Sequence, residues 1–171
     1  MGLKQALLTS EEIKSLSPVN IFSSTSPRAK ETARIIGEQL KLKPVAKKIF
    51  LEGFLPGQSQ YEKTQKTLLL SSEKIIRQNK IKAAKKALDN ARKFIFQTQN
   101  EERSCDVFVI HGNIIRHQVC KALRINGSKH WKFMDVGHTT LTVLKIKPDG
   151  KIVLLRFSDC GHLPHRMRTY T

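Results

Sequence analysis

A short apolar run that ends abruptly at a His-Gly pair is the feature that most constrains the fold. Residues 107–110 read Val-Phe-Val-Ile, a β-branched and aromatic run typical of a buried strand, and His111 and Gly112 follow at once. An amphipathic stretch then begins. This order predicts a strand, a tight turn and a helix start, which place a histidine and backbone N–H groups at the edge of an α/β sheet, where anions bind.

A second strand-to-helix junction lies near the start of the chain. Residues 19–22 (Val-Asn-Ile-Phe) predict a brief strand that leads into the hydroxyl-rich run 23–26, and Pro27 then opens an amphipathic helix with Arg28 in its first turn. A cation is mildly unfavourable at a helix N-terminus unless an anion binds there. Arg28 therefore indicates either a ligand or an ion pair with Glu31 or another carboxylate.

The two junctions together favour a phosphate site. Taken alone, His111 would be interpreted as a helix-capping histidine bonded to nearby backbone. In a parallel α/β sheet, however, both junctions open at the carboxyl ends of the strands, on the edge where ligands bind. We therefore predict that Arg28, His111 and Gly112 hold a phosphoryl group.

Alternating strand and helix patterns predict a single α/β domain over residues 1–171. The turn signal Lys-Pro-Asp-Gly at 147–150 predicts a late hairpin beside a mostly parallel sheet. The other predicted elements are a helix over 7–16 capped by Thr9 or Ser10, a helix from Pro27 to Leu40, a strand within 44–50, a loop over 52–57, two helices within 61–96 broken near Gln78 and Asn79, and a helix after His111.

Apolar residues at helical spacing predict which helix faces are buried. Within 61–96 the predicted buried positions are Ala84, Leu88, Ala91 and Ile95; after His111 they are Ile115, Val119, Ala122 and Leu123.

The chain carries a net charge of +17, from 31 Lys and Arg against 14 Asp and Glu. A positive field of this size attracts phosphates, acidic proteins, nucleic acid or an anionic membrane face. The basic residues concentrate between Lys74 and Lys93, which is typical of a solvated helix face. Aromatic residues are few and no nucleic-acid motif is present, so we predict no specific nucleic-acid partner.

No stretch approaches the roughly 18–20 consecutive apolar residues that a membrane-spanning helix requires, so we predict no transmembrane segment. The first residues do not resemble a secretory signal, because Glu11 and Glu12 follow closely. Three widely spaced cysteines, Cys105, Cys120 and Cys160, favour reduced thiols in an intracellular protein over a disulfide or a metal site.

His162 and His165 are spaced like weak metal ligands, but no Cys or Asp pair completes a site. We interpret them as surface histidines and predict neither a metal nor a cofactor.

Both junctions resemble signatures of the histidine phosphatase superfamily, which has the phosphoglycerate-mutase-like fold. Residues 26–33 (Ser-Pro-Arg-Ala-Lys-Glu-Thr-Ala) are similar to its second signature, and residues 110–116 (Ile-His-Gly-Asn-Ile-Ile-Arg) to its third. The chain most resembles the mitochondrial serine/threonine protein phosphatase branch, over about residues 7–162. The resemblance implies a three-layer α/β/α sandwich and a mitochondrial location; apart from the resemblance, we expect a cytoplasmic location. Supporting segments are 51–53, 119–123, the stretch around Trp131, and 147–151.

The resemblance also implies a mechanism. In that family catalysis uses no metal: a histidine attacks phosphorus to give a phosphohistidine, which water then hydrolyses. Arg28 would clamp phosphoryl oxygens, and His111 would stabilise charge on the transferring group. Glu52 would protonate the leaving hydroxyl, the alternative being a loop carboxylate without a catalytic role.

One family signature is missing from the sequence. The nucleophile belongs to an Arg-His-Gly at the end of the family's first strand, and this chain contains no Arg-His-Gly. Arg116 and His117 precede Gln118 within a helix and are expected to face away from His111, and His162 is not expected to substitute. We therefore expect an N-terminally incomplete domain without its central strand, exposing strand edges that need a partner.

Three functions follow from these residues. One is a protein phosphatase that is inactive as written because it lacks the nucleophile strand. Another is a pseudophosphatase that binds phosphorylated or acidic partners without turnover, and the third is a basic scaffold or nucleic-acid binder. The expected partner is a phosphorylated protein or a small phosphomonoester, and a homo-oligomer is left open.

Overall fold

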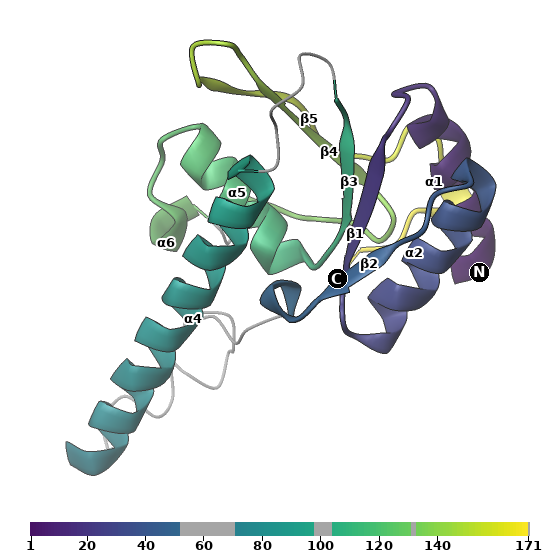
Figure 1. The fold of residues 1–171 in the computed structure, drawn as a ribbon. Coiled ribbons are helices and arrows are strands. Elements are labelled where there is room, and N and C mark those ends of the chain that lie inside the picture. Colours follow the sequence, from purple (N-terminus) through teal and green to yellow (C-terminus); the bar gives the residue numbers. More distant parts are fainter. Residues whose placement is uncertain (52–70, 98–103, 131–132, 171) are drawn as a thin grey trace.

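The computed structural model describes residues 1–51, 71–97, 104–130 and 133–170. Helices and strands alternate along most of the chain, and two consecutive strands and a short 3-10 helix follow (Figure 1). The α-helices are α1 (Gly2–Lys14), α2 (Pro27–Leu40), α4 (Ser71–Gln97), α5 (Gly112–Ala122) and α6 (Gly127–His130). The strands are β1 (Asn20–Ser24), β2 (Val45–Lys47), β3 (Asp106–Val109), β4 (Leu141–Ile146) and β5 (Ile152–Asp159), and the short 3-10 helices are η1 (Lys48–Phe50) and η3 (His165–Met167).

Three parallel strands form the main sheet, in the order β2-β1-β3. Phe22 of β1 lies opposite Val45 of β2 and Phe108 of β3. β4 and β5 form a separate antiparallel pair. At their turn the Gly150 N–H donates to the Lys147 carbonyl at 2.8 Å, with Gly150 at φ +76°, a conformation that glycine adopts without strain. The predicted α/β class, with a mostly parallel sheet and a late hairpin, is confirmed.

Helices cover both faces of the main sheet, so the molecule has the predicted three layers (Figure 1). α1 and α2 lie against one face, and α4 and α5 against the other. The buried residues of the α1/α2 cluster are Ile13, Ile21, Ala33 and Ile36. Those of the α4/α5 cluster are Phe50, Ala84, Leu88, Ala91 and Ile114.

α1 begins at Gly2 rather than at the predicted Leu7, and the predicted capping role of Thr9 and Ser10 is wrong. Both side chains lie inside the helix and are buried. The Thr9 hydroxyl donates to the Gln5 carbonyl at 2.8 Å, and the Ser10 hydroxyl to the Leu7 carbonyl at 2.6 Å. Hydroxyls that bond to the preceding turn are satisfied inside a helix, which removes the reason to place them at its start.

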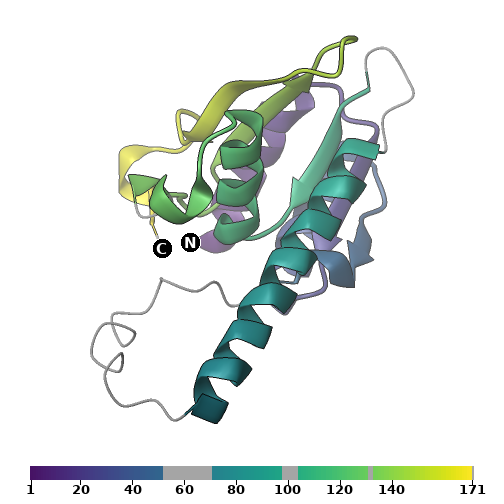
Figure 2. The same cartoon turned by 90° about the vertical axis from the view of Figure 1, so that its left-hand side faces the viewer.

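α4 is a single helix from Ser71 to Gln97, so the predicted break near Gln78 and Asn79 is wrong. Neither residue is Gly or Pro, and each lowers helix stability by at most about 0.7 kcal/mol relative to Ala, too little to interrupt a long helix. The far end of α4 extends beyond the body of the molecule (Figure 2). The predicted elements over 52–57 and 61–70 lie outside the described residues.

The carboxyl-terminal half of α4 packs as predicted. Ala84, Leu88 and Ala91 are buried, and Ile95 packs against the same cluster. The basic side chains on the other side are exposed, as expected of a solvated face: Lys82, Lys85, Lys86 and Lys93.

The predicted buried face of α5 is only partly correct. Val119 is fully buried, but Leu123 is 46% exposed and Ile114 is buried in its place. α5 contacts α4 on one side and the β4–β5 hairpin on another. A helix buried against two partners has no single apolar stripe, so spacing alone predicts its inner face poorly.

All three cysteines are free thiols, as predicted. Cys120 is buried, while Cys105 and Cys160 are half-buried. Burial raises the pKa of the Cys120 and Cys105 thiols, which keeps them protonated and unreactive near neutral pH. No helix in the described ranges is both long and apolar enough to cross a bilayer.

His117 gives the fold a pH dependence at the contact between α4 and α5. Its Nε2 lies 3.3 Å from Asp89 Oδ1. Burial lowers the pKa of His117 below its usual 6.5, although Asp89 opposes the shift. The unfolded chain therefore takes up this proton at higher pH than the folded one, and the free energy of unfolding should fall as pH drops below about 6.5.

Urea unfolding followed between about pH 8 and pH 5 checks this expectation. His117→Gln should make the decline shallower than in the wild-type protein, because glutamine does not titrate. An equally steep decline in both proteins would contradict the assignment to His117.

Candidate functional site

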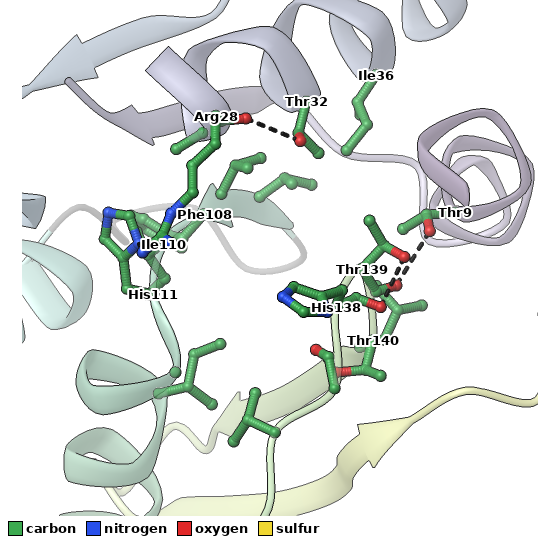
Figure 3. Close-up of a pocket in the computed structure, with 18 of the residues that line it drawn as sticks. Thr9, Arg28, Thr32, Ile36, Phe108, Ile110, His111, His138, Thr139 and Thr140 are labelled. Carbon is green, nitrogen blue, oxygen red and sulfur yellow. Dashed lines mark hydrogen bonds between the residues drawn. The ribbon is translucent and has the colours of Figure 1, made fainter. Parts of the chain in front are cut away.

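The two strand-to-helix junctions open into one pocket, as the sequence predicts. Its cavity volume is about 550 Å³, within the usual range of ligand sites. α1, α2, β3, the start of α5 and residues 136–141 line it (Figure 3). Arg28 and His111 lie together on one side.

Arg28 and His111 are in direct contact. Arg28 Nη2 lies 2.9 Å from His111 Nδ1. A guanidinium can only donate hydrogen bonds, so Nδ1 accepts and the neutral imidazole carries its proton on Nε2. The two residues are 83 positions apart in the chain, and the parallel pairing of β1 with β3 brings them to the same edge.

The loop after β1 holds the other side of the His111 ring. Nε2 lies 2.9 Å from Ser24 Oγ and 3.3 Å from Ser26 Oγ. Ser24 is fully buried, and its hydroxyl also accepts the Ser26 backbone N–H at 3.2 Å. Because Nε2 is directed at buried Ser24, Nδ1 is the nitrogen presented to Arg28 and to any ligand beside it.

Two helix N-termini contribute positive potential to the pocket. α2 starts after Ser26 and α5 starts after His111, and neither of these N-cap residues caps its helix with its side chain. Neither helix has an acidic residue in its first turn, and no Asp or Glu is among the described residues that line the pocket. The macrodipoles of both helices therefore favour an anion here.

Glu31, the first alternative partner of Arg28, pairs elsewhere. Its Oε1 lies 2.8 Å from Arg34 Nη2 on the exposed face of α2, and this contact lowers the pKa of the Glu31 carboxyl. Gly112 lines the pocket beside His111. A Cβ built on Gly112 would come no closer than 3.6 Å to any atom, so space is not what requires glycine. Glu52 lies outside the described residues.

Arg116 does not face away from His111, contrary to prediction, because it lines the same pocket. Helical side chains lean toward the N-terminus of their helix, and Arg116 folds back over Gly112. Its Nε donates to the Met134 carbonyl at 2.7 Å and its Nη1 to Asn113 Oδ1 at 3.2 Å. Arg116 thus fastens the opposite wall of the pocket to α5.

His138 is a pocket residue that the sequence reasoning missed. It lies across the cavity from Arg28 and His111 (Figure 3). Its Nδ1 lies 3.1 Å from Thr169 Oγ1, and its backbone N–H donates to the Thr169 carbonyl at 2.9 Å. The only local signal is a Gly-His-Thr-Thr sequence before a strand, which does not distinguish a site residue from a loop histidine.

His162 is half-buried rather than a surface residue, so that interpretation is wrong. Its Nε2 lies 3.0 Å from Thr9 Oγ1 and 3.1 Å from the Thr139 carbonyl, at the wall of the pocket. The tail that follows β5 folds back onto α1, which burial patterns in the sequence do not indicate. His165 is exposed, as predicted. Within the described ranges no three His, Cys, Asp or Glu residues are grouped so as to hold a metal ion.

Comparison with known proteins agrees with this geometry. The family model of the histidine phosphatase superfamily (branch 1) matches residues 1–159. The mitochondrial serine/threonine-protein phosphatase Pgam5 of Drosophila erecta is 28% identical over 179 residues, covering 99% of this chain and 58% of that protein. Its Caenorhabditis elegans counterpart is 34% identical over 71 residues, covering 42% of this chain and 25% of that protein. The chain thus spans between about a quarter and three fifths of these relatives.

A solved structure is similar over the whole chain. Phosphoglycerate mutase of Plasmodium falciparum has a TM-score of 0.69 and 28% sequence identity, covering 99% of this chain and 91% of that one. Since the family model covers nearly the entire sequence and both junction motifs meet in one pocket, this chain belongs to the histidine phosphatase superfamily.

Proposed function

We propose that this chain is the phosphoryl-binding part of a phosphoglycerate-mutase-like serine/threonine protein phosphatase. The observation that carries the proposal is the contact between Arg28 Nη2 and His111 Nδ1 at 2.9 Å, between the N-termini of two helices. The Arg28 donor lies there in a positive potential beside a histidine nitrogen that becomes a second donor on protonation, an arrangement that suits a phosphoryl group.

Each residue has a defined part in binding. The planar guanidinium of Arg28 can hold two phosphoryl oxygens at once. When the anion takes the place of Arg28 beside Nδ1, His111 can donate through a protonated Nδ1 while Nε2 still donates to Ser24. The backbone at Gly112 adds the positive end of α5. Because these groups supply the positive charge that holds a phosphoryl group, the proposed binding requires no metal ion and no organic cofactor.

Hydrolysis would need one more group. A histidine nitrogen would form a bond to phosphorus while the ester P–O bond breaks, and Glu52 would give its proton to the leaving oxygen. Water would then displace the histidine and release phosphate. The sequence contains no Arg-His-Gly to supply that histidine. We therefore expect the chain as written to bind phosphomonoesters without turning them over.

The contact between Arg28 and His111, without a nucleophile beside it in the sequence motifs, favours a second candidate function, that of a pseudophosphatase. A chain that keeps Arg28 and His111 without the nucleophile could serve as a binding module for phosphorylated or acidic proteins. The net charge of +17 would speed the approach of such partners. A mitochondrial location is part of the proposal, because the Pgam5 relatives are named mitochondrial. The absence of a specific nucleic-acid partner stays a prediction, and a homo-oligomer stays open.

Anion binding and turnover can be measured on the same protein. We expect inorganic phosphate and vanadate to raise the melting temperature, because they bind the folded state alone. Hydrolysis of p-nitrophenyl phosphate should stay at buffer background with a chelator present. His138→Ala is the informative variant, because His138 is the histidine that faces Arg28 and His111 across the cavity. Metal-independent turnover that His138→Ala abolishes would show that the pocket contains its own nucleophile, contrary to this proposal.

A further inference from the structure

The side of α4 that faces away from the core carries a row of lysines. Ala84 and Leu88 mark the buried side of the helix. Lys82, Lys86 and Lys93 lie on the opposite side, within about 40° of one another around the helix axis. All three are exposed, and the helix rises about 17 Å from the first to the last at about 1.5 Å per residue. We call this row the lysine ridge.

The surfaces on both sides of the lysine ridge are also positive. Burial is the main cause that lowers the pKa of His117 on α5, and the charges of Lys121 and Arg92 lower it further. On the other side, Lys47 Nζ of β2 lies 5.4 Å from the centre of the Phe94 ring of α4. β2, η1 and α5 contain no acidic residue. Positive charge therefore continues from β2 across α4 to α5.

The acidic residue nearest in sequence to the lysine ridge is paired elsewhere. Asp89 is the only Asp or Glu within residues 81–97, and its Oδ1 lies 3.3 Å from His117 Nε2 at the contact with α5. Within the part of the chain that the structure describes, no carboxylate forms an ion pair with Lys82, Lys86 or Lys93. Their charges are therefore available to an anion outside the molecule.

The composition and shape of this surface indicate the kind of anion. The exposed cations of the ridge are lysines, which act as point charges, whereas sites that recognise a single phosphate favour the planar fork of arginine. The exposed residues beside them, Ala83, Ala87 and Asn90, are small or polar and offer no ring on which a base could stack. α4 extends beyond the body of the molecule, so an extended flat surface can approach it (Figure 2). Basic clusters of about four to eight residues on an amphipathic helix are typical of binding to anionic lipids.

We propose that the lysine ridge binds the surface of an anionic phospholipid membrane, with Lys82, Lys86 and Lys93 against the headgroups. The contact is electrostatic, because the apolar side of α4 is buried in the core. It is separate from the proposed phosphoryl site, since no described residue that lines that pocket belongs to α4.

Sedimentation with lipid vesicles tests the inference on the full chain. The vesicles contain either phosphatidylcholine alone or phosphatidylcholine with about one third phosphatidylserine. The wild-type protein should sediment with the second kind only, and added salt should weaken the binding because it screens charge beyond about 10 Å at about 0.1 M. Replacing Lys82, Lys86 and Lys93 together with Gln should lower the partition coefficient roughly 100-fold, since each lysine close to an anionic surface contributes a factor of about five.

A matched control removes three exposed lysines from the opposite face of the molecule. α1 and α2 cover that face (Figure 1), and the residues changed to Gln are Lys4, Lys14 and Lys30. Both triple variants lower the net charge from +17 to +14. Gln is about as favourable as Lys in a helix, so circular dichroism of both variants should match the wild-type protein. The control should lose less than about 5-fold in partition coefficient, because its lysines lie away from the membrane.

The other outcomes contradict the inference in different ways. Equal sedimentation with both kinds of vesicle would show that charge does not drive the binding. Equal losses in the two triple variants would assign the binding to overall charge rather than to the lysine ridge. Failure of the wild-type protein to sediment with either kind would also overturn the inference. If the protein bound duplex DNA through the same three lysines and bound no vesicles, the ridge would be a nucleic-acid surface instead.

Discussion

Replacing Arg28 with alanine should remove most of the affinity for phosphate. Hydrogen bonds to charged groups contribute about 1.5–3 kcal/mol, so the dissociation constant should rise roughly 10- to 150-fold. At a phosphate concentration of about 100 times the wild-type dissociation constant, ligand stabilises the folded state by about 2.7 kcal/mol. The variant should keep only about 0.4 kcal/mol of this if its affinity falls about 100-fold. For a chain of this size the wild-type shift corresponds to roughly 5–10 °C in melting temperature.

Arg34→Ala is the matched control for this measurement. Arg34 lies on the same helix and carries the same charge, but it pairs with Glu31 and Glu38 on the exposed face of α2. Its loss changes the net charge as much as the loss of Arg28 does. We expect full stabilisation by phosphate in Arg34→Ala. If both variants lost the same amount, the effect would come from overall charge rather than from a site at Arg28.

Replacing Phe50 with alanine should have the largest effect on stability. Its side chain is fully buried in the α4/α5 cluster. The ring makes edge contacts with Phe94 at 5.6 Å and with Phe108 at 5.7 Å between centroids. Loss of such a side chain removes apolar burial and leaves a cavity, which lowers the free energy of unfolding by about 3–5 kcal/mol. That is a large share of the roughly 5–15 kcal/mol that a domain has.

Phe133→Ala is the control, because the Phe133 side chain is 76% exposed. Urea unfolding followed by circular dichroism should give a change within about 0.5 kcal/mol for this variant. Phe50→Ala should lower the midpoint strongly with little change in slope. Similar midpoints for the two variants would mean that Phe50 is not part of the core. Because Phe50 packs against Phe108 of β3, the same variant should also loosen the strand that positions His111.

Local patterns in the sequence predicted most of the elements, because local physics decides them. The apolar run 107–110 before His111 gave a strand, and Pro27 opened a helix where its fixed φ suits the first turn. Some of the errors have a common origin. The buried face of α5 and the direction of Arg116 depend on partners in other elements, which short-range periodicity does not contain.

In the candidate site, too, local patterns were predictable from the sequence and contacts between distant residues were not. Arg28 and His111 could be chosen from the sequence, because each follows a strand and parallel strands end at a common edge. The tautomer of His111 could not be predicted from the sequence, since it depends on Ser24 and Arg28 contacting opposite nitrogens of one ring. The place of His138 in the pocket could not be predicted either, because the tail at Thr169 holds the His138 backbone there.

The sequence by itself therefore determined the layered α/β class, the two anion-ready junctions, the superfamily and the absence of an Arg-His-Gly nucleophile. It did so because strand and helix periods, turn residues and short motifs are properties of neighbouring residues. Only the tertiary structure decided that Arg28 touches His111, that His138 faces them, and that β3 and residues 136–141 line the same pocket. These are contacts between residues tens of positions apart, and packing of the whole chain sets them.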